Sequence, residues 1–112
     1  MKIANFDTDE KVFIIAELSA NHSGSLQTAL DTIKAAKRAG ADAIKLQTYT
    51  PDSLTLDSRG EDFMIKGGLW DGANLYELYR QALTPREWHE QLFSAARDEG
   101  LVCFSSPFCN DD

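Results

Sequence analysis

The chain has 112 residues, of which 43% are hydrophobic and 26% charged, and its formal net charge is −7. This length allows one domain at most, and the composition is that of a globular protein rather than a disordered tail. The acidic balance argues against a nucleic-acid or anionic-membrane partner, because both need clustered Lys and Arg. It leaves room for an anionic small substrate in a locally positive pocket.

No apolar run approaches the ~20 residues of a membrane span, and the N-terminus lacks the basic and apolar segments of a signal peptide. Cys103 and Cys109 lie six positions apart, which fits neither a redox C-x-x-C motif nor half of a zinc site. We therefore expect reduced thiols and a cytoplasmic protein.

The first part of the chain predicts a strand, a helix and a second strand. Residues 12–16 are a continuous apolar, β-rich run, typical of a strand covered on both faces. An amphipathic helix follows between Ser25 as N-cap and Gly40 as C-cap. The strand at residues 42–48 comes after almost no loop, which favours a parallel βαβ unit.

A second helix and a third strand complete the pattern. Residues 84–87 read TPRE, a capping box with proline at the first helical position. Gly100 ends this helix, and residues 101–108 predict a third buried strand that Pro107 interrupts. The apolar face of the helix consists of Trp88, Leu92, Ala95 and Ala96.

The connection at residues 49–83 is far longer than the ~2–6 residues usual after a strand, and such loops are often functional. It contains the glycine-rich KGGLWDG and one expected short helix. Because it leaves the carboxyl end of a strand, where parallel α/β folds place their sites, we favour a functional loop over an insertion that only shields the fold. The helix should share one apolar face, formed by Leu75, Leu78, Tyr79 and Ala82.

The order β-α-β-loop-α-β indicates an α/β fold that stops one strand into a third repeat. Three parallel strands with two or three helices do not close a barrel. We therefore expect residues 1–112 to be the N-terminal portion of a (β/α)8 TIM-barrel catalytic domain of ~250 residues, with the remainder outside this chain.

Lys45 is a charged residue in the middle of a strand that its flanks mark as interior. Side chains alternate along a strand, so Lys45 and Gln47 share the inner face while Ile44 and Leu46 face the helices. A buried ammonium needs an anionic partner or a depressed pKa. The partner is either a bound anion or Glu17, which ends the preceding strand; Ser105 and Ser106 should gather at the same strand ends.

The two histidines do not make a metal site. His22 and His89 are far apart in the sequence and show no H-E-x-x-H or similar spacing. We expect His22 to form loop hydrogen bonds and His89 to be structural.

The motifs FIIAELSANHSG, GADAIKLQTYTPD and FSSPF, in this order and spacing, resemble the N-terminal barrel region of the sialic acid synthase family. Within the family, the segments IKGGLWDG and LYELYRQALTPREWHEQLF are most similar to the synthases of pseudaminic acid. The resemblance covers nearly the whole chain and implies about the first third of a family member.

The resemblance implies condensation of phosphoenolpyruvate with an N-acylated amino sugar, a 6-deoxy-2,4-diacetamido hexose, with release of phosphate. By residue, it implies that Lys45 and Ser106 bind phosphoenolpyruvate, that Glu17 and Gln47 contact the sugar, and that Glu17 and Lys45 are catalytic. It further implies a Mn²⁺ or Mg²⁺ ion that polarises the sugar aldehyde, held by residues outside this chain. A homodimer with a C-terminal antifreeze-like domain, also outside this chain, is implied as well.

Two alternatives stay open. A close relative could act on another amino sugar and make N-acetylneuraminate or legionaminate, with the loop at residues 49–83 as the discriminating feature. The chain could also be a non-catalytic fragment or anion-binding module, and we expect the 112 residues alone to be inactive.

Overall fold

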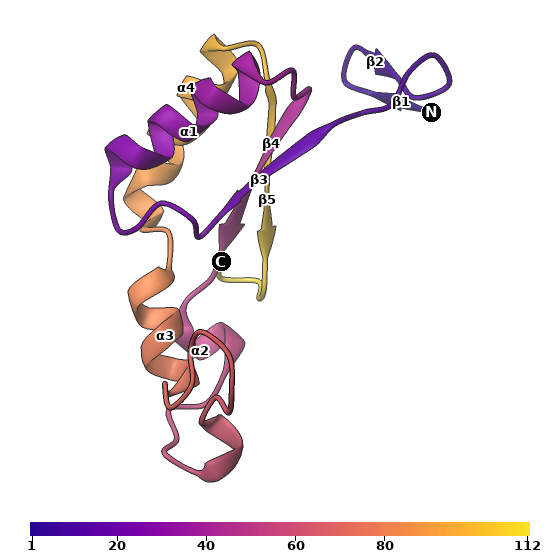
Figure 1. The fold of residues 1–112 in the computed structure, drawn as a ribbon. Coiled ribbons are helices and arrows are strands. Elements are labelled where there is room, and N and C mark those ends of the chain that lie inside the picture. The colour runs from indigo at the N-terminus through magenta and orange to yellow at the C-terminus, as the bar shows by residue number, and fades with distance from the viewer.

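The structure, a computed structural model, describes residues 1–112 and contains two sheets. The smaller one is an antiparallel hairpin of β1 (Lys2–Ile3) and β2 (Phe6–Asp7). This hairpin stands away from the rest of the molecule (Figure 1). An edge-to-face contact between Phe6 and Phe13, with ring centroids 4.8 Å apart, ties it to the segment that leads into the main sheet.

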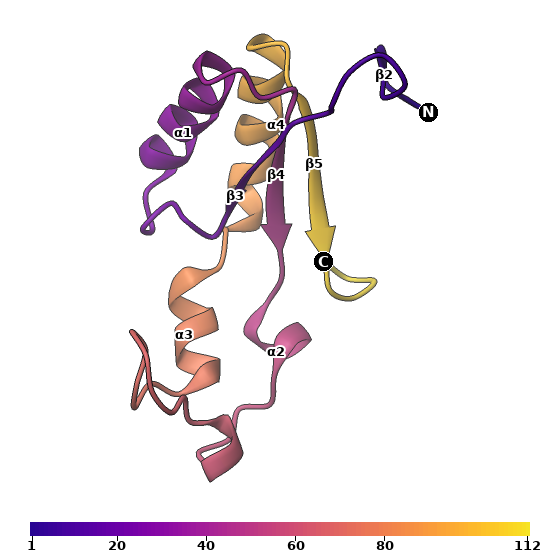
Figure 2. The ribbon, with the colours of Figure 1, turned by 45° about the vertical axis from the view of Figure 1, so that its right-hand side comes forward.

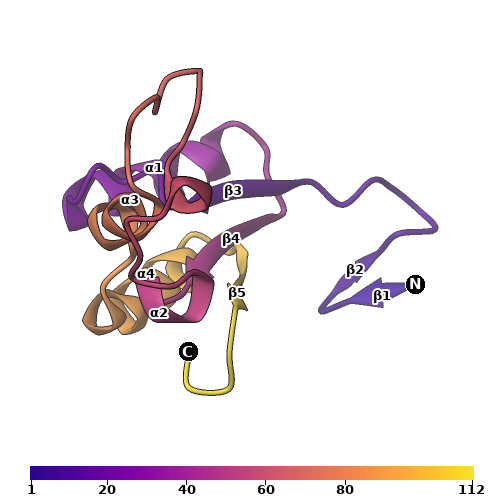
Figure 3. The same ribbon diagram turned by 90° about the horizontal axis from the view of Figure 1, so that it is seen from below.

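The main sheet has three parallel strands in the order β3-β4-β5, namely Ile15–Ser19, Ala43–Thr48 and Val102–Pro107. The helix α1 (Leu26–Arg38) connects β3 to β4, while η2 (Arg86–Trp88) and α4 (His89–Asp98) precede β5. Both α1 and α4 lie on the same face of the sheet (Figures 2 and 3). The predicted α/β fold with parallel βαβ units is confirmed.

The hydrophobic core lies between the sheet and these two helices. Ile44 and Leu46 of β4 are fully buried in one cluster with Ile33 of α1 and Leu92 of α4. Burying each such side chain contributes roughly 1.5–3 kcal/mol. The predicted outward orientation of Ile44 and Leu46 is therefore correct, and the opposite face of β4 remains for its polar residues.

The first strand differs from its prediction in position and in burial. It was expected at residues 12–16 with both faces covered, whereas β3 begins at Ile15 and ends at Ser19. Val12 is 79% exposed and Ile15 is 43% exposed. Val12 precedes the strand, and Ile15 lies on the sheet face opposite the helices, which no helix of this chain covers.

The helix ends agree with the prediction only in part. Ser25 caps α1 as expected, since its hydroxyl accepts a hydrogen bond from the Thr28 amide at 3.2 Å. The C-cap of α1 is Ala39 rather than the predicted Gly40, which follows it with a φ of +92°, a left-handed conformation that favours glycine.

The predicted capping box at residues 84–87 is wrong. The first turn is the 3₁₀ helix η2, whose N-cap is Pro85, and no side chain caps it. The Thr84 hydroxyl contacts His22 and the Ser19 carbonyl instead. Its long-range partners replace the local cap.

Residues 49–83, called here the 49–83 segment, fold beyond the carboxyl ends of the strands (Figure 1). The predicted short helix is α3. Asn74 caps it by accepting a hydrogen bond from the Glu77 amide at 3.2 Å. In chain order the segment contains α2 (Pro51–Leu54), η1 (Glu61–Phe63) and α3 (Leu75–Ala82).

Across the structure, no helix combines the length and the apolar character that crossing a membrane requires.

Candidate functional site

The four predicted site residues meet at the carboxyl ends of the parallel strands. The sheet register pairs Glu17 with Lys45, and Gln47 with Ser106. All four side chains lie on the sheet face opposite the helices, as the alternation along β4 requires. Together with Ser19 and Phe108 they line a cavity of about 140 Å³, called here the inner cavity.

Lys45 forms an ion pair with Glu17, with Nζ 2.6 Å from Oε1. The Ser19 hydroxyl donates a hydrogen bond to the other carboxylate oxygen, Oε2, at 2.8 Å. The hydrogen bond from Lys45, and after it the one from Ser19, lowers the pKa of Glu17 below its usual value. Of the two partners considered for Lys45, Glu17 is therefore the one present in this chain.

The ion pair leaves Lys45 partly exposed to solvent. The Lys45 side chain is 28% exposed and that of Glu17 is 51% exposed. Both line the inner cavity, and an ammonium carries three donors, of which Glu17 Oε1 uses one. An anion that enters the cavity can therefore bind Lys45 beside Glu17 or in its place.

A bulge in β3 shapes this corner of the site. Glu17 pairs with Lys45, but Ser19 pairs with Leu46, so Leu18 is an additional residue in the strand. Leu18 stays in the core at 1% exposure, while Glu17 and Ser19 both line the inner cavity. Bulges of this kind commonly redirect side chains near functional sites.

The two serines of β5 point in different directions. Ser106 lines the inner cavity, as predicted. Ser105 lies 2.5 Å from the Thr48 hydroxyl, which is 2.8 Å from Nε2 of His89. The expectation that Ser105 joins the site is wrong, because strand alternation turns it toward α4. His89 is structural, as expected, and its Nδ1 donates to the Pro85 carbonyl at 3.3 Å.

His22 joins three parts of the chain. It is fully buried, and its Nδ1 accepts a hydrogen bond from the Gly24 amide at 3.1 Å. This leaves Nε2 to donate to the Thr84 hydroxyl, also at 3.1 Å. Burial lowers the pKa of His22, which favours this neutral ring. The predicted role as a hydrogen-bonding loop residue is confirmed.

No group of three or more His, Cys, Asp or Glu side chains is placed to hold a metal ion. Both histidines are already engaged in the contacts described above. The residues of this chain therefore do not fit the divalent cation that the family resemblance implies. Cys103 and Cys109 are both free thiols.

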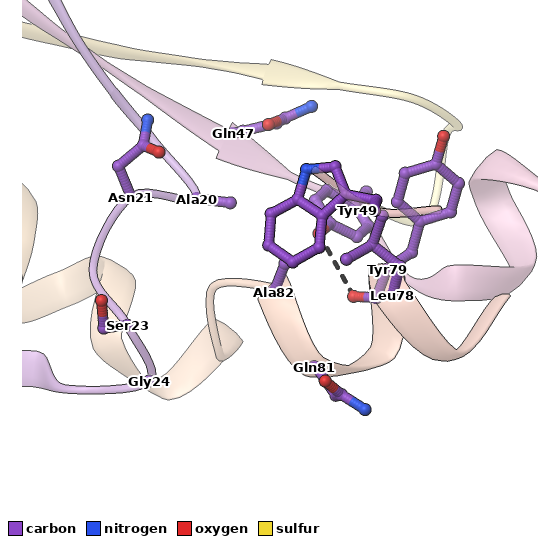
Figure 4. Close-up of a pocket in the computed structure, with 11 residues that line it drawn as sticks. Ala20, Asn21, Ser23, Gly24, Gln47, Tyr49, Leu78, Tyr79, Gln81 and Ala82 are labelled. Carbon is purple, nitrogen blue, oxygen red and sulfur yellow. Dashed lines mark hydrogen bonds between the residues drawn. The ribbon is translucent and has the colours of Figure 1, made fainter. Parts of the chain in front are cut away.

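A larger cavity of about 430 Å³ lies between the β3–α1 loop and the 49–83 segment (Figure 4). Gln47 lines both this outer cavity and the inner one. Its aromatic lining was not predicted, although the WDG sequence at residues 70–72 and the apolar face of α3 indicate it. The lining consists of Ala20, Asn21, Ser23, Gly24, Gln47, Tyr49, Trp70, Leu78, Tyr79, Gln81 and Ala82.

Parallel strands, helices on the outer face and polar side chains at the carboxyl ends are the arrangement of (β/α)8-barrel enzymes. Residues 32–112 match the NeuB family, and the chain belongs to that family. The predicted resemblance to sialic acid synthases is thereby confirmed.

The chain is 70% identical to the pseudaminic acid synthase of Campylobacter jejuni over 112 residues, which are 100% of this chain and 33% of that protein. It is 56% identical to the pseudaminic acid synthase of Helicobacter pylori over 95 residues, 85% of this chain and 28% of that protein. The predicted likeness to pseudaminic acid synthase is confirmed. The chain thus spans about a third of the length of these curated relatives.

Among solved structures, the N-acetylneuraminic acid synthetase of Leptospira borgpetersenii serovar Hardjo-bovis, in complex with citrate, resembles the chain with a TM-score of 0.69. The identity is 27%, over 89% of this chain and 30% of that one. The predicted fold class, part of a TIM barrel, is confirmed.

Proposed function

We propose that the whole protein condenses phosphoenolpyruvate with a 6-deoxy-2,4-diacetamido hexose to give pseudaminic acid and phosphate. The observation that carries this proposal is the inner cavity, where Glu17, Lys45, Gln47 and Ser106 converge. The names of the C. jejuni and H. pylori relatives support the choice of product.

Lys45 and Ser106 bind the phosphoenolpyruvate anion in this proposal. Charge-assisted hydrogen bonds from an ammonium are stronger than neutral ones, and a serine hydroxyl donates readily to phosphate. The anion replaces Glu17 as the partner of Lys45, whose Nζ lies 2.6 Å from Glu17 Oε1 in the resting ion pair. Freed from that pair, the Glu17 carboxylate can hold or deprotonate a sugar hydroxyl, while Gln47 contacts the same sugar.

The reaction then forms one carbon–carbon bond and breaks one carbon–oxygen bond. C3 of phosphoenolpyruvate attacks the aldehyde carbon of the open-chain sugar, whose oxygen becomes a hydroxyl. Water adds at C2 and supplies the proton that this hydroxyl needs. The tetrahedral intermediate loses phosphate by cleavage of the bond between C2 and the phosphate ester oxygen. The proton of the C2 hydroxyl leaves with the phosphate, which gives the 2-keto acid.

Several properties of the whole protein remain predictions. The protein should depend on Mn²⁺ or Mg²⁺, held by residues outside this chain. The remainder of the barrel, the C-terminal domain and the homodimer are also expected and also involve residues outside this chain. The cytoplasmic location and the inactivity of the 112 residues alone also stay predictions.

Lys45→Ala in the whole protein tests the proposal. The variant should bind phosphoenolpyruvate about 10- to 100-fold more weakly, because one charge-assisted contact is lost. Isothermal titration measures this affinity, with Lys34→Ala on the exposed face of α1 as the matched control. Unchanged affinity in Lys45→Ala would show that Lys45 serves only its ion pair.

Phosphate release with different sugars tests the product. The 6-deoxy-2,4-diacetamido hexose should be turned over in preference to N-acetylmannosamine and to the legionaminate precursor. Preference for either of the latter would assign the protein to N-acetylneuraminate or legionaminate synthesis.

A Glu17→Gln variant should bind phosphoenolpyruvate yet lose turnover, and full turnover would exclude a catalytic role for Glu17.

A further inference from the structure

The outer cavity has two chemically different walls. Figure 4 shows Asn21 of the β3–α1 loop across the cavity from Tyr49, Leu78 and Tyr79, with Gln47 at its upper edge. Asn21 and Gln47 offer amide donors and acceptors, whereas Tyr49, Leu78 and Tyr79 offer mainly carbon surface beside the amide of Gln81. A cavity of about 430 Å³ is large enough for a monosaccharide-sized ligand.

The aromatic wall is held in place by its own contacts. Tyr49 is only 5% exposed, and its hydroxyl donates to the Tyr79 carbonyl at 3.2 Å (Figure 4). The two rings meet edge to face with centroids 6.0 Å apart, and Phe108 packs on Tyr49 in the same way at 6.2 Å. Phe108 also lines the inner cavity, so this wall is continuous with the predicted anion site.

Trp70 completes the lining from a turn that fixes its backbone. The Trp70 carbonyl accepts a hydrogen bond from the Ala73 amide at 2.9 Å, and the Gly72 amide donates to the Ile65 carbonyl at 2.9 Å. Gly67, Gly68 and Gly72 have φ values of +82°, +75° and +80°, which residues with a side chain rarely adopt. The turn thus holds an indole that is still 54% exposed beside the cavity.

Gln47 connects the two cavities. It lines the inner cavity with Lys45 and the outer cavity with Tyr49 and Trp70. A molecule in the outer cavity can therefore place one end beside an anion bound at Lys45. Its other end then faces the aromatic wall. A methyl group there gains apolar contact, whereas a hydroxyl loses its hydrogen bonds to water and finds no replacement partner.

We propose that Trp70, which lines the outer cavity with Tyr49 and Leu78, determines specificity by packing on the methyl-bearing edge of the acceptor sugar. This aromatic wall selects deoxy and N-acyl positions over free hydroxyls. The inference rests on the proposed function and adds to it the residues that choose the sugar.

The test compares Trp70→Ala and Leu69→Ala in the whole protein. Leu69 is the neighbouring residue in the same turn; it is 88% exposed and lines neither cavity. Phosphate release is measured with the 6-deoxy-2,4-diacetamido hexose and with N-acetylmannosamine, which carries a hydroxyl at C6. A Trp70→Phe variant, with circular dichroism of each protein, separates loss of the indole from misfolding.

Trp70→Ala should lower kcat/KM for the deoxy sugar about 10- to 100-fold and lower the preference over N-acetylmannosamine, since lost apolar contacts discriminate to this extent. The KM for phosphoenolpyruvate should stay within about twofold, Trp70→Phe should restore part of the loss, and Leu69→Ala should match the wild type. If the wild type turns over the deoxy sugar and Trp70→Ala has an unchanged kcat/KM, the inference is wrong while the proposed function stands. The same conclusion follows if Trp70→Ala loses kcat/KM equally on both sugars. A wild-type protein that turns over neither sugar refutes the proposed function itself.

Discussion

The sheet and the 49–83 segment both contribute to the candidate site, but different forces position their residues. None of the ten residues in the hydrophobic core cluster lies in the 49–83 segment; all come from the β3–β5 sheet, its helices and their turns. The segment is held by caps, glycine turns, hydrogen bonds such as those around Asn74, and the edge-to-face contacts of Tyr49. Packing therefore fixes Lys45, whereas polar contacts fix Trp70, and the two parts should respond differently to mutation.

The largest difference should appear in truncations of leucine. Leu46→Ala removes a fully buried side chain from β4 and should cost about 2–5 kcal/mol in the free energy of unfolding. Leu69→Ala, at an 88% exposed position of the segment, should change it by no more than about 0.5 kcal/mol. Urea denaturation measures both, and equal costs would contradict the contrast between the regions.

His22 lies where the two regions join, because it bonds to Thr84 at the end of the segment. His22→Gln should cost about 1–3 kcal/mol at pH 7, since a buried network loses its geometry. The pKa of His22 is lowered from 6.5 by burial, so the unfolded chain takes up a proton at a higher pH than the folded one. The stability it contributes is therefore present above about pH 6.5 and is lost as the pH falls toward the folded pKa.

Unfolding measured between pH 7 and pH 5 separates this effect from that of the carboxylates. Glu17 and Asp42, whose pKa values are lowered from 4.5 and 3.8, affect stability only at more acidic pH. The wild type should lose stability over this window, and His22→Gln should lose less. Parallel pH profiles for the two proteins would argue against this assignment.

Asn74→Ala should act on the segment alone. The side chain caps α3, and its amide donates to the Ser58 carbonyl at 2.7 Å. Loss of the cap should cost about 1 kcal/mol and speed proteolysis within the segment. Asn74→Asp keeps the capping acceptor but not the amide donor, so its stability should lie between those of the wild type and Asn74→Ala. Faster hydrogen exchange in β4 would mean that the regions are not independent.

The smallest effect is expected from labelling the thiols, which perturbs neither region. Burial raises the pKa of Cys103, which packs against the core from β5, to about 11. At pH 8 iodoacetamide should therefore modify the exposed Cys109 first, because the thiolate is the reactive form. Mass spectrometry with a Cys109→Ser control checks this order, and rapid labelling of Cys103 would indicate that the sheet opens.

Local patterns predicted the parts of the fold that depend on local forces. The alternation around Lys45 gave the correct faces of β4, and the apolar spacing identified α1 and α3. The TPRE capping box failed because Thr84 bonds to His22, 62 positions away in the sequence. Ser105 was misplaced for a different reason: alternation applies to β5 as well, so Ser105 and Ser106 face opposite sides of the sheet.

The outer cavity could not be predicted for a further reason. It exists only once the 49–83 segment folds back so that Trp70 and Tyr79 lie near the β3–α1 loop. No periodicity within the segment encodes that return. Glu17 and Gln47, by contrast, needed only the assumption that strand ends converge.

The alternation of β4 also limits how the protein can change over time. A one-residue insertion in this strand would turn Lys45 toward α1 and α4 and place Leu46 in the inner cavity. The core packing of Leu46 and the ion pair between Lys45 and Glu17 would then be lost together. Changes in length within the 49–83 segment leave that register intact, because no residue of the core cluster lies in the segment.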